Sequence, residues 1–165
     1  MTRSQMVALM RKLIADEQAT GFSEGGNLEE PEGMQELLNY LDRAVEEYSK
    51  RQAGSKDVRL MKTMTVSDGG RLPDDFLSFC GIVPLTLNGN VMSLYDTSMT
   101  MPVRYMARLP YVTSYTDTQE LPYEQDQSIA ITALGAIYAL NKHEYNVSQH
   151  LLLMGYGVGS DVSSK

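Results

Sequence analysis

The side chains that most often carry chemistry are few in this sequence and lie far apart. The two histidines, His143 and His150, are seven residues apart, about two helical turns, which is too far for both to bind one metal ion. Zinc sites use closer pairs together with cysteine or carboxylate ligands. We therefore interpret both histidines as surface or helix-capping residues and predict no metal site.

Three other side chains have alternative interpretations. Cys80 lies beside Gly81 in an apolar context, which predicts a small buried side chain, although a distant histidine could still fold near it and activate it. Asp74 and Asp75 form an acid pair, but carboxylates at the start of a helical turn also accept hydrogen bonds from free amides. We predict a capping role for this pair and no catalytic residue.

The glycine-rich segments lack the context of nucleotide-binding loops. Neither Gly25-Gly26 nor Gly69-Gly70 is followed by the Lys-Ser/Thr pair of a phosphate-binding loop. The run from Gly155 to Gly159 neither follows a predicted strand nor opens a helix. No cofactor is expected.

Composition is typical of one folded domain. The chain has 165 residues, of which 42% are hydrophobic and 21% charged, so it can bury a core. No apolar run approaches the ~20 residues of a membrane-spanning helix, and the helical spacing at the N-terminus argues against a signal peptide. The single cysteine excludes an intrachain disulfide and suits a reducing cytoplasm.

Acidic residues are concentrated in one part of the chain. The net charge is −7, and between Asp16 and Glu47 ten acids face Arg43 alone. Such a segment repels phosphate and disfavours ordinary nucleic-acid binding. It is either a solvated face with an acidic loop, or a surface that faces a basic partner or DNA that must not adhere.

Hydrophobic periodicity predicts helices at both ends and strands between them. Apolar stripes with helical spacing cover residues 4–15 and 34–52, with Thr2 or Ser4 as the first N-cap and Pro31 near the start of the second helix. Residues 18–33 should form a loop. A third helix runs from Tyr123 to about Gly155, interrupted near residues 143–146, and should be buried on several sides.

Strands and turns are expected between residues 57 and 118. Alternation predicts a strand over residues 58–66 and another over 101–109, which the flanking prolines would place at a sheet edge. Asn88-Gly89 predicts a type I′ hairpin. Residues 72–79 are interpreted as a short helical turn that is anchored to the core by phenylalanines. The fold class is therefore α+β: a helical bundle, made of an N-terminal helix pair and a long C-terminal helix, with a β-rich insertion at about 57–118.

Tyrosine and methionine are abundant, with ten and eleven residues and no tryptophan. Tyrosine offers apolar area with a polar end, and methionine gives adaptable contact surface. Core packing explains many of them, and we expect others to lie at an interface. The middle segment carries Tyr95, Tyr105, Tyr111, Tyr115 and Tyr123.

The order of these elements resembles that of the head–tail adaptor (connector) proteins of tailed bacteriophages. The likeness covers most of residues 4–155, and it rests on order and spacing and on no catalytic signature. It is carried by four segments: Glu36–Ala44 in the second helix, Leu72–Phe76, Tyr105–Pro110, and Leu121-Pro122-Tyr123 leading into the Ala-rich helix through Leu140.

The resemblance implies a structural virion protein with no enzymatic activity. Copies would form a ring, typically of twelve, that joins the portal protein to a downstream neck or tail protein and continues the DNA channel. DNA would pass without sequence-specific binding, and no membrane would be involved. The protein would be made in the host cytoplasm and reside at the head–tail junction.

The resemblance also implies roles for particular segments. Residues 1–155 would form a single adaptor-like domain, and residues 156–165 an extended tail that docks on the portal or a neighbouring subunit. The candidate docking residues of this tail are Tyr156, Val158, Asp161 and Val162. The candidate channel-facing acids are Glu24, Glu29, Glu30 and Glu32.

Alternatives remain open because the β-rich region is large for a simple connector. The chain could be another neck or tail component, such as a head-closure, tail-completion or tail-tube subunit. A more distant alternative is a small enzyme that uses Asp74, Asp75 or Cys80. A DNA-binding regulator built on the first two helices is disfavoured by the acidic charge.

Overall fold

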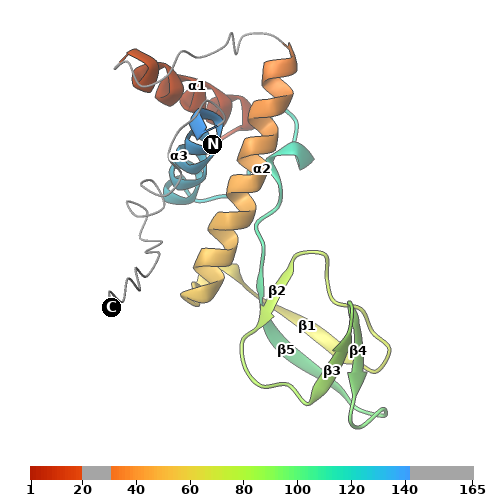
Figure 1. Cartoon of the computed structure of the whole chain (residues 1–165). Helices are drawn as coiled ribbons and strands as arrows, with labels where there is room; N and C mark the ends of the chain where they lie inside the picture. Colours follow the sequence, from red (N-terminus) through yellow and green to blue (C-terminus); the bar gives the residue numbers. More distant parts are fainter. Residues whose placement is uncertain (20–30, 142–165) are drawn as a thin grey trace, which may run out of the picture.

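The computed structural model describes residues 1–19 and 31–141 (Figure 1). Three helices, α1 (Arg3–Ala19), α2 (Pro31–Gly54) and α3 (Gln125–Asn141), pack together. Between α2 and α3 lie five strands and two short 3₁₀ segments: η1 (Val58–Leu60), β1 (Met61–Ser67), β2 (Phe76–Phe79), β3 (Leu85–Asn88), β4 (Val91–Leu94), β5 (Thr100–Ala107) and η2 (Val112–Ser114). The α+β prediction is therefore confirmed, with the β-rich insertion where the sequence placed it.

The three helices pack together because each has apolar side chains that are stabilised by burial. Both α1 and α2 bury apolar stripes against α3, which is apolar on several faces as predicted. The helices approach closely at Gly135, where an added Cβ would lie 3.0 Å from Leu41 Cδ2. The largest fully buried side chains of this core are Met6, Met10, Leu37, Leu41, Val45, Met106, Val112 and Ile131.

The helix starts follow local capping chemistry. At α1 the Thr2 hydroxyl accepts a hydrogen bond from Gln5 N at 3.3 Å, and the Gln5 side chain accepts one from Thr2 N at 2.8 Å. This reciprocal pair is a capping box, so Thr2 is the N-cap residue. Helix α2 begins at Pro31, whose missing amide costs no hydrogen bond at a first helical position.

The strands form a small two-layer unit that we call the β-module (residues 61–107). Strands β1, β5 and β2 form an antiparallel sheet in that order, and β3 pairs with β4 as a hairpin. The module lies beyond the C-terminal end of α2, apart from α1 (Figure 1). It has its own small core of Val66, Met92 and Leu94, against which Met64, Met101 and Val103 of the sheet pack.

The predicted hairpin is present, but its turn lies one residue later. Asn88 pairs with Val91, so Gly89 and Asn90 are the two turn residues. Only Gly89 has a positive φ, of 61°. A positive φ at the first central position alone fits a type II′ turn, so the predicted type I′ turn is wrong.

The start of the β-module differs from the prediction. Val58 to Leu60 form a 3₁₀ turn capped by Asp57, and the strand begins only at Met61. Val58 is consequently 73% exposed, although the predicted alternation placed it in the sheet.

The segment predicted as a helical turn is wrong in its second half. Asp74 and Asp75 form a turn, but Phe76 to Phe79 form strand β2, which pairs with β5. Phe76 contacts Phe79 edge-on with ring centroids 4.8 Å apart, and it stacks on Tyr105. The two phenylalanines thus pack on one another and on Tyr105 of β5. They do not anchor a helical turn to the core, as was predicted.

The strand bounded by prolines lies at the centre of its sheet, and not at an edge as predicted. Arg104 O accepts a hydrogen bond from Cys80 N at 3.0 Å, so the backbone of Arg104 points toward β2. Pro102, two residues earlier, points the same way but lies beyond the end of β2, which pairs only as far as Tyr105. The missing amide of Pro102 therefore removes no sheet hydrogen bond.

Several predicted positions lie outside the described residues. These are His143, His150, the C-terminal part of the third predicted helix, the tail residues Tyr156, Val158, Asp161 and Val162, and the acids Glu24, Glu29 and Glu30. Glu32 lies in the first turn of α2.

Candidate functional site

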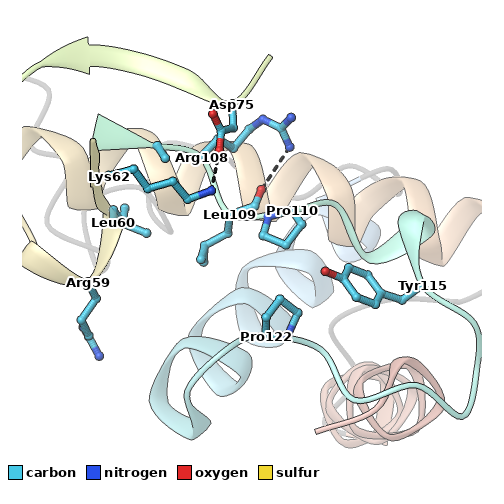
Figure 2. Close-up of a pocket in the computed structure, with 10 residues that line it drawn as sticks. Arg59, Leu60, Lys62, Asp75, Arg108, Leu109, Pro110, Tyr115 and Pro122 are labelled. Atoms are coloured by element: carbon cyan, nitrogen blue, oxygen red, sulfur yellow. Dashed lines mark hydrogen bonds and ion pairs between the residues drawn. The ribbon is translucent and has the colours of Figure 1, made fainter. Parts of the chain in front are cut away.

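A cavity of about 430 Å³ lies where the β-module joins the helices (Figure 2). Charged side chains from η1, β1 and the turn before β2 form part of its lining, together with Arg108 after β5. The Tyr115 side chain lies beside Pro110 and Pro122 (Figure 2). The apolar lining consists of Leu60, Ala107, Leu109, Pro110 and Pro122.

Asp75 is the acidic centre of one side of this cavity. Its Oδ2 accepts from Lys62 Nζ at 2.6 Å, and its Oδ1 accepts from the Tyr105 hydroxyl at 3.0 Å. Lys62 and Tyr105 are cross-strand partners in β1 and β5, so the register brings both donors to the same carboxylate. Burial, with Asp75 adding to it, raises the pKa of Tyr105 to about 12.

This arrangement corrects the predicted role of the acid pair. Asp75 does not cap a helix, because a strand follows it, and it serves as the acceptor for two side chains of the sheet. Asp74 is exposed in the same turn. Since both Asp75 oxygens already accept hydrogen bonds, the carboxylate is positioned for structure and offers little as a general base.

Arg59 forms ion pairs with three carboxylates beside the cavity. It donates to Asp57 at 2.7 Å and to Glu124 and Asp126 at 2.8 Å each, which joins η1 to the start of α3. Figure 2 shows Arg59 turned away from Lys62 and Asp75. The ion pairs raise the pKa of Arg59 and lower the pKa of Asp57 and Asp126, with the side-chain hydrogen bonds as the largest cause.

The Arg59 cluster should make stability depend on pH in the acid range. Asp57 and Asp126 have folded pKa values below their ordinary 3.8, so their contribution is present above that pH and is lost as pH falls through the lower folded values. Replacing Arg59 with Met should destabilise the protein at neutral pH, and the difference from wild type should shrink below about pH 4.

Urea unfolding of both proteins at several pH values measures this difference, since the remaining carboxylates contribute equally to each. A gap between wild type and R59M that stays constant down to the lowest pH would contradict a stabilising role for the cluster. Added salt should also narrow the gap at neutral pH, because the acids are partly exposed.

A buried serine of α2 forms a hydrogen bond with the segment that follows β5. Ser49 is fully buried, and its hydroxyl accepts a hydrogen bond from Leu109 N at 3.1 Å. Nearby, the Arg108 guanidinium lies 3.6 Å over the Tyr111 ring. Together these contacts hold the cavity wall that runs from β5 toward η2.

Replacing Ser49 with Ala should cost about 1–3 kcal/mol, because the buried Leu109 amide would lose its acceptor. Thermal or urea unfolding measures the change. Ser55→Ala is the control, since Ser55 is exposed at the end of α2, and it should change stability by less than about 0.5 kcal/mol. Equal effects of the two changes would show that the Ser49 hydrogen bond contributes little.

A second, more open hollow of about 330 Å³ lies on the β-module. It is bordered by the loop from Cys80 to Pro84 and by the part of β5 that β2 does not reach. Arg104 is its one charged lining residue. Cys80 lines it and is only partly buried, where the sequence predicted a small buried side chain, although it does pack against the main core.

Large apolar side chains are exposed on the β-module. Ile82 is 103% exposed and Tyr95 is 79% exposed, and the backbone amide of Tyr95 donates to Pro84 O at 3.5 Å. This contact brings the Tyr95–Met99 turn beside the loop that carries Ile82. Among the tyrosines singled out from the sequence, Tyr95 is the exposed one, while Tyr105 and Tyr123 are buried.

The charged clusters and the exposed Ile82 were not singled out from the sequence. Arg59 lies 65 and 67 residues from its partners Glu124 and Asp126, and no local pattern marks that contact. Ile82 stands between Gly81 and Pro84 in a loop. An isolated apolar residue in such a turn-rich segment is the one signal that could have pointed to it.

Searches for related proteins add no assignment: no family model, no curated protein and no solved structure matches the chain. Across residues 1–19 and 31–141, no helix is both long and apolar enough to cross a membrane. In the same residues, no group of three His, Cys, Asp or Glu side chains could hold a metal ion.

Proposed function

We propose that this chain is a structural virion protein, a ring-forming head–tail adaptor of a tailed bacteriophage. It would join the portal protein to the next neck or tail protein and continue the DNA channel, without catalysis. The observation that carries the proposal is the β-module, which lies beyond the helices and exposes Ile82 and Tyr95 to solvent. Exposed apolar side chains that lie close together, and exposed tyrosines in particular, are typical of protein-docking surfaces.

The charged groups around the cavity support a structural role. Lys62, Asp75 and Tyr105 bind one another, and Arg59 binds three carboxylates. The first set stabilises the β-module internally, and the second joins η1, which leads into the β-module, to the start of α3. Both would suit an adaptor that carries load between two layers. The acids at Glu24, Glu29, Glu30 and Glu32 would face the channel, where repulsion of phosphate lets DNA slide.

Deleting the chain from the phage that encodes it tests this function. DNA-filled heads and separate tails should accumulate, and the wild-type chain supplied from a plasmid should restore joined particles. Normal tailed particles in the deletion strain would overturn the proposal. Tails of abnormal length or structure would instead assign the chain to a tail layer.

A further inference from the structure

The exposed apolar side chains fall into two separate groups that differ in charge. The first group, which we call the tip patch, consists of Ile82, Tyr95 and Met99 beside the hollow that Arg104 lines. The second, the corner patch, consists of Val58 and Ile129 beside the carboxylates of Asp57, Glu124 and Asp126. Of the large apolar side chains exposed in the described residues, only Leu87 lies outside both groups.

The tip patch carries a cation that the chain does not neutralise there. Arg104 has no ion pair among the described residues, and it is the one charged group that lines the hollow. Asp96 lies in the adjacent turn but outside the hollow, and its carboxylate accepts hydrogen bonds from Ser98 N and Oγ. A carboxylate on a partner is therefore the group that the hollow favours.

The corner patch has an excess of acid. Arg59 balances one of its three carboxylates, which leaves two negative charges, and the Glu124 and Asp126 side chains are each 62% exposed. Val58 precedes Arg59 in η1, and Ile129 lies three residues after Asp126 on α3, one turn further along the helix. The corner thus pairs exposed apolar groups with accessible carboxylates.

We propose that the tip patch of one copy docks on the corner patch of a second copy. Both patches have exposed apolar area, and their charges are complementary, with a cation on the tip and carboxylates on the corner. Because the two surfaces differ, the contact is head-to-tail, and two copies in contact still have one free tip and one free corner to which further copies can add. Such contacts generate a closed ring or an open filament. The inference rests on the self-assembly part of the proposed function and supplies its surfaces.

Charge reversal on each surface tests the contact with the purified full chain. Sedimentation velocity and native mass spectrometry over a concentration series measure association. Arg104→Glu places a carboxylate against the acidic corner, and Glu124→Arg places a cation against Arg104. Each variant alone should associate at least about tenfold more weakly than wild type. Asp74→Arg alters charge at an exposed position outside both patches and should leave association unchanged.

Mixing the two variants gives the decisive result. In the mixture, the wild-type tip of the E124R chain meets the wild-type corner of the R104E chain, and the two reversed groups meet each other. Association should therefore recover in the mixture and in the double variant R104E/E124R, while thermal unfolding verifies that every chain is folded. A wild-type chain that stays monomeric at the highest concentration reached, or variants that are not rescued by mixing, would overturn the proposal.

The outcomes separate this contact from the adaptor function. Recovery by mixing, together with normal particles in the deletion strain, would keep the head-to-tail contact and remove the phage assignment. Failure of mixing, together with unjoined heads and tails in the deletion strain, would keep the adaptor function and remove this pair of surfaces.

Discussion

Replacing Leu41 with Ala should lower the free energy of unfolding by about 2–5 kcal/mol. Leu41 is fully buried on α2 and lies against α3 at Gly135, where the two helices approach closely. The smaller side chain would leave a cavity at the contact that holds the bundle together. Urea unfolding followed by circular dichroism measures the loss.

Gly135 supplies the control for this contact. An Ala at position 135 would place its Cβ 3.0 Å from Leu41 Cδ2, so the change should be destabilising in the wild-type chain. In the L41A chain that atom is gone, and Gly135→Ala should instead be stabilising, because Ala is favoured over Gly in a helix by about 1 kcal/mol. The same sign in both backgrounds would contradict direct packing of Leu41 on Gly135.

Replacing Met92 with Ala should unfold the β-module before the helices. Met92 is 1% exposed and is one of three buried residues in the small second core. Removing its side chain should cost about 2–5 kcal/mol, a large share of what so small a core can provide. Hydrogen exchange read by mass spectrometry should show lost protection in β3, β4 and β1, with protection of α2 and α3 retained.

Leu87→Ala is the matched control for Met92. Leu87 is the cross-strand partner of Met92 but is 45% exposed, so its loss should change exchange little. Equal loss of protection in the helices and in the β-module of M92A would contradict the view that the second core stabilises its own unit.

The helices could be predicted from the sequence because their signals are local. The stripes of α1 and α2 repeat with helical spacing, and Pro31 and the Thr2–Gln5 pair mark the starts. The β3–β4 hairpin was equally accessible, since a Gly-containing turn lies between two apolar runs. Its exact turn type was not, because Asn88-Gly89 and Gly89-Asn90 both satisfy the local rule.

The errors in the β-module arise from pairing between distant segments. Pro73 followed by two aspartates marks a turn or a helix start equally well, and strand β2 forms because β5, some thirty residues later, offers Phe76 and Phe79 a pairing edge. Likewise, Pro102 suggests an edge strand until the length of β2 is known. The Arg59 cluster also depends on distant segments, because Arg59 in η1 pairs with Glu124 and Asp126 at the start of α3.

Gold labelling of intact phage particles, with an antibody raised against this chain, tests the adaptor proposal most directly. The proposal predicts that joined particles carry label at the single vertex where the tail joins the head, and at no other position on the particle. Heads and tails separated before labelling would show which side of the junction retains the chain. Label along the tail, or particles that lack the chain altogether, would contradict the adaptor function.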